Sequence, residues 1–455
     1  MPERTAANPA PAPVGATPLD RLRELIRIPT VSRPDPAEVD WAQFERFIET
    51  LAQLYPLTHE RLELERVAGH SLLYRWAGHS EGPPSVLMAH YDVVPATEEG
   101  WKHPPFAAEL TGEGAEQLLW GRGTLDDKGA LTAALEAVEA ALAAGFTPEH
   151  DVYLSFGHNE EIAGDGAVRI VELLASRGVR PGFVLDEGGA IVEKVFPGVE
   201  APIAVVGVSE KGITTLTLTV EERGGHASMP PPRTATARLA RAIVRLTKRP
   251  HPAALSATNL EMLRTVGRHA RGIYRFLFTR TRLTAPLLKA VFARLSEETA
   301  AMVRTTQAVT MLRAGLAENA LAERAVATVN IRVAVGSSVE QAVAHVRRAV
   351  ADDAVRIEVA NPSEPSPVSP TEGPAWDMLR AAIEQSYLGT VVTPYVMLGA
   401  SDARRFTAIS DHVYRFSPFE MSKAQRDTLH AIDERMHVAT FLQGIEFYRT
   451  LLRGL

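Results

Sequence analysis

The stretch SVLMAHYDVV, residues 85–94, decides the fold. Its first part, Ser85 to His90, is an apolar run of strand length that follows a Gly-Pro-Pro turn at 82–84. A run without polar alternation predicts a strand that is buried on both faces, as in a parallel sheet. Polar groups that bind ligands lie just outside the carboxyl ends of such strands. His90 and Asp92 are therefore candidates for a functional site.

The same arrangement recurs further along the chain. Apolar runs at 152–157 and 182–186 close on Glu160 and Glu161 in GHNEE and on Asp186 in VLDEGG. Helical periodicity at 129–144 and 167–176 separates these runs. Strands that alternate with helices predict an α/β fold, with a mostly parallel central sheet flanked by helices.

A second pattern begins near residue 212. The segments 212–221 and 325–335 alternate apolar and polar side chains, which predicts strands with one buried face. With helices at 234–246 and 338–350 and a strand at 355–359, they predict an inserted two-layer α+β domain. We expect a flexible tail at 1–18, the first part of the main domain at 19–211, the inserted domain at 212–360 and the second part at 361–455. A helical stretch at about 250–304 is either a set of packed helices or a cap beside the substrate cleft.

Composition narrows the function classes. Apolar residues make up 45% of the 455 residues and charged residues 23%, values typical of a soluble globular protein. The net charge of −7 argues against nucleic-acid binding. The sequence contains no run of ~18 apolar residues, the length that would predict a membrane span. The Ala- and Pro-rich start lacks the apolar core of a signal peptide, and the chain has no cysteine, so we expect a cytoplasmic protein without disulfides.

Side chains with metal-binding chemistry gather at the predicted strand ends. Imidazole nitrogens and carboxylate oxygens suit zinc and similar cations, and a chain without cysteine must build a zinc site from them. Asp92 is placed to accept the second N–H of a metal-bound His90. Asp126, in GRGTLDDKG before a predicted helix, is a candidate to bridge two cations. Of the neighbours Glu160 and Glu161, one is expected to bind metal and the other to act as general base. His430 in LHAIDE completes the set.

Taken together, these motifs give the chain a family resemblance. From about Leu19 to the C-terminus it resembles the aminoacylase/carboxypeptidase family of dinuclear zinc peptidases, through AHYDVVPA, LWGRGTLDDKG, HNEE, LDEGG, GGHASMP and VNIRVAVG. The branch it resembles most is the carboxypeptidase S and N-fatty-acyl-amino-acid hydrolase group, through MVRTTQAVTMLRAG at 302–315 and VYRFSPF at 413–419.

The resemblance implies a role for each matching residue. His90 and Asp186 would hold one zinc ion, Glu161 and His430 the second, and Asp126 would bridge them, with cobalt or manganese as possible substitutes. Glu160 would be the general base and Asp92 would orient His90. The inserted domain would be a lid and dimerisation domain, whose His226 reaches the active site of a partner in a homodimer. Asn319 and Arg332 would bind the substrate carboxylate, and the Asp126–Asp127 peptide bond would be cis.

Two motifs depart from the family pattern. The usual Gly-Gly-Thr-Asp-Ser turn reads GASDA here, from Gly399 to Ala403, and the usual His-Gly-x-Asn-Glu reads HAIDE, from His430 to Glu434. The GASDA turn should border the carboxylate pocket, so Gly399 is a candidate substrate-binding residue and the change concerns substrate preference.

Three functions follow as expectations. The first is hydrolysis of an N-acyl amino acid, or of the C-terminal peptide bond of a peptide, with release of a free amino acid. The second is a dipeptidase or a specific biosynthetic N-deacylase. The third is a silent metal-binding scaffold, which Glu160 argues against because such a scaffold needs no general base.

Overall fold

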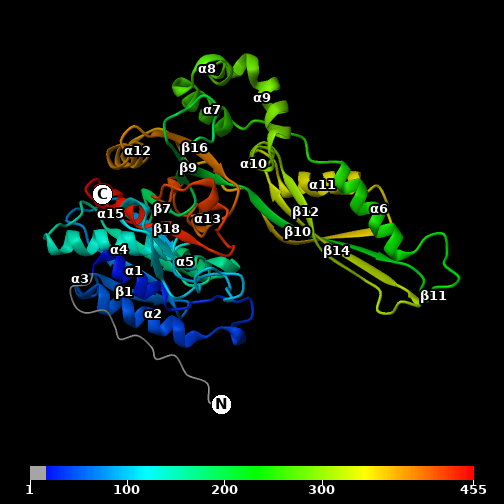
Figure 1. Cartoon of the computed structure of the whole chain (residues 1–455), viewed down its shortest axis with the longest axis horizontal. Coiled ribbons are helices and arrows are strands. Elements are labelled where there is room, and N and C mark those ends of the chain that lie inside the picture. The colour runs from blue at the N-terminus through cyan, green and yellow to red at the C-terminus, as the bar shows by residue number, and fades with distance from the viewer. Residues whose placement is uncertain (1–16) are drawn as a thin grey trace.

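The computed structural model describes residues 17–455 (Figure 1). Nearly all of the expected tail lies outside these residues. Helix α1 (Pro18–Ile26) begins with a capping box, in which the Thr17 hydroxyl accepts a hydrogen bond from the backbone N–H of Asp20. No helix in the described part of the chain is both long and apolar enough to cross a bilayer.

A nine-stranded sheet forms the larger part of the molecule, here called the body. Its strands are β1 (Glu63–Val67), β2 (Ser71–Trp76), β3 (Ser85–His90), β6 (Val152–Gly157), β7 (Phe183–Asp186), β8 (Ala190–Val192), β9 (Ile203–Glu210), β16 (Val391–Met397) and β17 (Val413–Arg415). They are ordered β1-β2-β6-β3-β7-β17-β9-β16, with β8 on β9. The central run β6-β3-β7-β17 is parallel throughout. A small sheet, β18 (Arg435–His437), β5 (Leu118–Trp120) and β4 (Glu109–Thr111), lies beside it.

Helices cover both faces of this sheet, as predicted. The body helices are α1, α2 (Trp41–Leu54), α3 (Pro56–Arg61), α4 (Lys128–Ala143), α5 (Gly166–Ser176), α12 (Pro374–Ser386), α13 (Ala403–Phe406), α14 (Lys423–Arg426) and α15 (Val438–Leu452). One core holds α1, α2, α4, α12 and α15, and a second holds α5 and α13. Leu131, Leu135 and Val138 of α4 are completely buried, and each contributes about 1.5–3 kcal/mol. This burial fixes the N-terminal end of α4, which follows the turn that carries Asp126.

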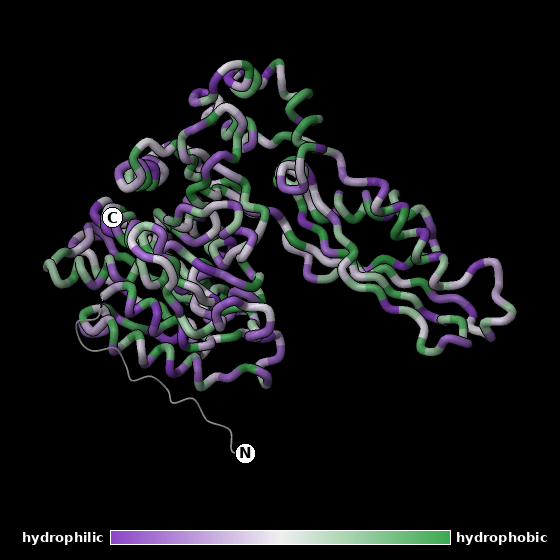
Figure 2. Tube along the Cα trace, in the orientation of Figure 1, coloured by the Kyte–Doolittle hydropathy of each residue, from purple (hydrophilic) through white to green (hydrophobic). Residues whose placement is uncertain are grey.

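A four-stranded antiparallel sheet forms the second part, here called the lid. Its strands are β12 (Thr306–Ala314), β14 (Arg324–Val333), β10 (Gly212–Glu221) and β15 (Val355–Ser363), in that order, and its helices are α6 (Ala235–Lys248) and α11 (Val339–Val350). Apolar and polar residues alternate along these strands (Figure 2). This alternation causes the layering, because Leu216, Leu218 and Ile331 are completely buried in the core that the sheet shares with the helices. A short ladder, β11 (Gly225–His226) with β13 (Ala320–Leu321), lies at the far tip of the lid (Figure 1).

Strand β12 is absent from the elements predicted from sequence. It lies at the edge of the lid sheet and most of its residues are exposed, so it has no buried alternation to detect.

The helical stretch contains α7 (Ala257–His269), α8 (Gly272–Thr279), α9 (Thr281–Leu295) and α10 (Glu297–Met302), here called the insert. Helix α7 contributes Met262, Leu263 and Val266 to the main core of the body. The insert therefore leaves the lid and packs on the body beside β16 (Figure 1).

Candidate metal centre

Three parallel strands bring the predicted residues to one edge of the body sheet. Strand β3 ends at His90, which pairs in register with Gly157 at the end of β6. Glu160 and Glu161 follow β6 in a single 3₁₀ turn, and β7 ends at Asp186. The sequence prediction that these strand ends meet is in agreement with the structure.

Asp126 lies between two imidazoles. Its Oδ1 is 3.0 Å from Nε2 of His90, and its Oδ2 is 2.9 Å from Nε2 of His430. The same nitrogen of His430 is 3.0 Å from Oε2 of Glu161. The Asp126–Asp127 peptide bond is cis, as the resemblance implied. One carboxylate thus faces two separate imidazoles, each with one oxygen.

Asp92 organises the loop that carries the two glutamates. It is completely buried, and its two oxygens accept hydrogen bonds of 3.1 Å from the backbone N–H groups of Glu160 and Glu161. Its Oδ1 lies 3.4 Å from Nδ1 of His90. Burial is the largest single influence and opposes its ionisation, but the hydrogen bond and charge of His90, together with hydrogen bonds from Ser32 and the backbone of Glu161, keep the pKa of Asp92 below its usual value.

Asp186 and Glu187, the two acidic residues at the end of β7, contact different partners. Asp186 is directed at the GASDA turn, where its Oδ2 accepts a hydrogen bond of 2.8 Å from the backbone N–H of Ala403. Its neighbour Glu187 places Oε1 3.6 Å from Nε2 of His90. The structure therefore brings Glu187, rather than Asp186, next to His90.

The donor set fits a divalent metal centre. Ligand atoms of His90, Asp126 and Glu161 lie within 4.8 Å of one another, and so do those of His90, Asp127 and Glu187. Both carboxylate oxygens of Asp127 and Oε1 of Glu161 are buried without a hydrogen-bond partner among the described residues. Buried oxygens without donors are costly, and a bound cation would satisfy them. Asp127 and Glu187 were not singled out in the sequence, although each directly follows a predicted ligand.

Electrostatics support this assignment. Burial, with the charge of Asp126 second, raises the pKa of Glu187 to about 8. Burial also raises the pKa of Glu160 well above its usual value, with a further contribution from Glu187. Asp402 of the GASDA turn has its pKa raised to about 7 by burial and by the charge of Asp186. So many carboxylates in one buried region repel each other, and cations would offset that repulsion.

A buried ion pair that sequence reasoning missed holds the Asp126 turn. Arg122 donates a hydrogen bond of 2.7 Å to Oε2 of Glu434, and the backbone N–H of Leu125 donates one of 2.8 Å to Oε1 of the same carboxylate. Glu434 belongs to the HAIDE motif, only four residues after His430. The link therefore positions Asp126 and His430 relative to each other. Glu434 was noted in the sequence only as the end of that motif.

The predicted lid residues lie in two places. His226 is exposed at the tip, where the carbonyl of Asn319 accepts a hydrogen bond of 3.0 Å from the backbone N–H of Ala227. Arg332 lies at the other end of the lid, where it pairs with Ile213. This pair is next to Lys211, where the chain passes from β9 of the body to β10 of the lid, here called the crossing. The tip is remote from the metal centre within one chain (Figure 1). Gly399 lies in the turn after β16, two residues before Ser401, whose hydroxyl is 3.3 Å from Glu210.

This fold and this cluster of imidazoles and carboxylates define a metal-dependent hydrolase. Residues 86–454 match the profile of Peptidase family M20/M25/M40, and the chain belongs to that family. It is a member that cleaves amide bonds with the help of metal.

Relatives of known name cover almost the whole chain. A probable carboxypeptidase S-like 2 from Dictyostelium discoideum is 36% identical over 442 residues, which span 95% of this chain and 84% of that protein. The human N-fatty-acyl-amino acid synthase/hydrolase PM20D1 is 34% identical over 444 residues, 96% of this chain and 87% of that protein. These relatives agree with the branch named from sequence.

Solved structures share the fold at low identity. The M20 family metallo-carboxypeptidase Sso-CP2 from Sulfolobus solfataricus superposes with a TM-score of 0.69 at 18% identity, covering 96% of this chain and 99% of that one. Human carnosine dipeptidase 1 gives a TM-score of 0.64 at 15% identity, covering 96% and 95%.

Proposed function

We propose that this protein hydrolyses the amide bond of an N-acyl amino acid, or the C-terminal peptide bond of a peptide, and releases a free amino acid. The observation that carries the proposal is Asp126, whose two oxygens each face a different imidazole. Support comes from the named relatives, a carboxypeptidase S-like protein and an N-fatty-acyl-amino acid hydrolase.

Two zinc ions per subunit are the proposed cofactors. Asp126 would be shared between them, His90 and Glu187 would hold one, and Glu161 and His430 would hold the other, while Asp186 would support the turn beside them. Cobalt or manganese would suit the same nitrogen and oxygen donors. Bound zinc supplies an acidified water and a Lewis acid for the substrate carbonyl.

Glu160 is the proposed general base. Among the described residues, no hydrogen bond is donated to its carboxylate, which is therefore free to accept a proton. Burial raises its pKa, which favours its acceptance of a proton from water before it donates that proton to the leaving amine. Asp92 keeps the turn of Glu160 in place through the hydrogen bond to its backbone N–H.

The lid completes the site in this proposal. Arg332 binds the substrate carboxylate from the crossing side, near Gly399, since a guanidinium can hold a carboxylate through two hydrogen bonds. His226 and Asn319 lie at the remote tip, so they serve the active site of a second subunit in a homodimer. There His226 stabilises the oxyanion of the tetrahedral intermediate.

The test is amino-acid release by zinc-loaded protein from N-acetyl, N-lauroyl and dipeptide forms of one amino acid. Preference for the lauroyl form assigns it to fatty-acyl-amino-acid hydrolysis, and preference for the dipeptide assigns it to peptide cleavage. Absence of release from all three substrates would contradict the proposal.

A further inference from the structure

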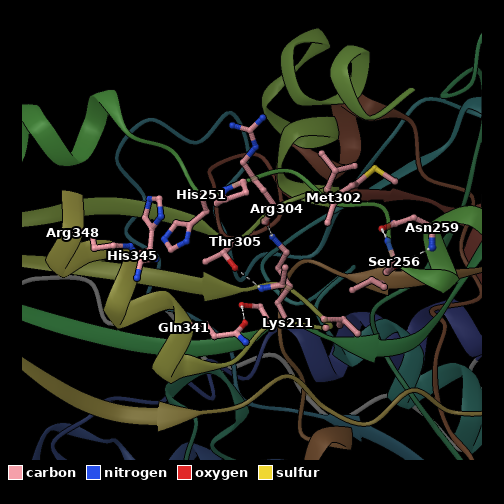
Figure 3. Close-up of a pocket in the computed structure, with 18 residues that line it drawn as sticks. Lys211, His251, Ser256, Asn259, Met302, Arg304, Thr305, Gln341, His345 and Arg348 are labelled. Carbon is pink, nitrogen blue, oxygen red and sulfur yellow. Dashed lines mark hydrogen bonds between the residues drawn. The ribbon is translucent and has the colours of Figure 1, made fainter. Parts of the chain in front are cut away.

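A cavity of about 380 Å³ lies at the crossing between body and lid, and none of its lining residues belongs to the metal centre (Figure 3). Its walls come from three parts of the molecule. The crossing supplies Lys211, and the lid supplies residues 334–337 and one face of α11. The insert and the segments that flank it supply the remaining wall, which consists of His251, Pro252, Ala254, Ser256, Asn259, Met302, Val303, Arg304 and Thr305. Val396 of β16 lines it as well, whereas its neighbour Met397 approaches Gly188 beside the metal-centre residues. The cavity therefore lies behind the crossing, and its volume suits a small ligand.

The lining is cationic and contains no carboxylate. Lys211, Arg304 and Arg348 line the cavity together with His251 and His345, whose rings stack with centroids 4.0 Å apart. Among the described residues, no carboxylate forms an ion pair with any of these side chains. Figure 3 shows the two imidazoles, Arg348 and Lys211 around the same space. The protein as a whole carries a net charge of −7, so this local excess of cations is not a general property of its surface.

Lys211 is buried, so its positive charge is unfavourable unless an anion lies beside it. The residue is 1% exposed, and its ammonium donates a hydrogen bond of 2.7 Å to the backbone carbonyl of Arg304. Burial, with the charge of Arg332 second, lowers the pKa of Lys211 to about 8. His251 is also buried, and its Nε2 has no hydrogen-bond partner among the described residues. A buried ammonium without a counter-ion is unfavourable, and an anion in the cavity would remove that cost.

We propose that this cavity is a binding site for a small anionic ligand, with a phosphate or carboxylate group against Lys211 and with Arg348 and the imidazoles beside it. Hydroxyl and amide groups of Thr305, Ser337 and Gln341 line the same space and can complete the hydrogen bonding. Because the walls belong to the lid, the insert and the crossing, the bound anion contacts all three parts.

Adjacent arginines on α11 provide a matched test. Both Arg347 and Arg348 are exposed on this helix, but only Arg348 lines the cavity. Binding of inorganic phosphate and of succinate to the zinc-loaded full chain is measured by calorimetry at constant ionic strength. We expect Arg348→Ala and Lys211→Met to weaken binding at least tenfold and Arg347→Ala to leave it unchanged, and the tighter of the two anions defines the ligand class.

Anions also bind zinc, and the paired variants separate the two sites. Binding at the metal centre is affected equally by Arg348→Ala and Arg347→Ala. Equal affinity in these two variants, or no binding to the unaltered protein, would overturn the proposal. The readout does not use turnover, so it is independent of whether the proposed hydrolysis is correct.

Discussion

Arg122 and Glu434, 312 residues apart in the chain, form a fully buried ion pair with an N–O distance of 2.7 Å. The pair connects the turn before α4 to the loop before β18. Because Asp126 belongs to the turn and His430 to the loop, the pair sets the separation between two proposed metal ligands.

Replacing Glu434 with glutamine should therefore weaken metal binding without removing a ligand. We expect zinc affinity to fall about 10–100-fold, as for other residues that position ligands, and the free energy of unfolding to fall by about 3–5 kcal/mol, because Arg122 stays buried without its partner. A zinc competition assay and urea unfolding measure the two effects. Glu446→Gln, in an exposed ion pair with Arg449, is the control and should change neither appreciably. Equal behaviour of the two variants would refute the positioning role.

Glu160→Gln should separate catalysis from metal binding. We expect the rate of amino-acid release to fall by about 10²–10⁴, since glutamine has no basic oxygen for the proton, while the zinc content stays the same. Rates on the preferred substrate and metal analysis of the same preparation check this. Full turnover with both metals bound would rule out Glu160 as the base.

Substitutions of the neighbouring residues Glu187 and Asp186 should have different effects on zinc content. Glu187→Gln should lower the zinc content by about one ion per subunit, because its carboxylate is the one next to His90. Asp186→Asn should retain both ions and instead loosen the turn at Ala403. Metal analysis after dialysis distinguishes them. Loss of zinc from Asp186→Asn alone would instead support Asp186 as the ligand, as expected from the sequence.

A homodimer with shared active sites predicts complementation. His226→Ala and Glu160→Gln proteins should each be nearly inactive, and mixing them under conditions of subunit exchange should restore part of the activity. The restored activity arises from sites that combine an intact Glu160 with an intact His226 of the other subunit. If exchange is demonstrated and activity stays at the level of the single variants, His226 does not act between subunits.

The buried Lys211 predicts a defined pH dependence of stability. The pKa of Lys211 is about 8 in the folded protein, compared with its ordinary value of 10.5. Between these two pH values, the side chain is protonated in the unfolded chain and neutral in the folded protein. Stability therefore rises with pH across this window, and the cost of the charged side chain is fully present below it. Relative to Lys211→Met, the unaltered protein should gain about 2 kcal/mol from pH 7.5 to 9.5 in urea unfolding. The exposed Lys248→Met should show no such difference; the same slope in both variants would contradict the assignment.

Much of the fold could be predicted because its signals are local. The run that ends at His90 and the alternation of Leu216 and Leu218 each report burial directly, and the structure has strands at both places. The choice between Asp186 and Glu187 could not be made in this way. Adjacent side chains of an extended segment point in opposite directions, and which one faces His90 depends on the turn at Ala403, more than 200 residues later. The same holds for the ion pair of Arg122, whose partner is close only in the folded chain.

The long separation in sequence between His90 and His430 also has a consequence during synthesis. The ribosome adds about 5–20 residues per second, so roughly 20–70 s pass between these two histidines. Helix α15, which shares a core with α4, is made later still. During this interval the nascent chain already carries most of the acidic ligands but lacks the imidazole that pairs with Glu161. The proposed metal centre is therefore completed only once His430 has been synthesised, and a chain that stops before this residue lacks one of its proposed ligands.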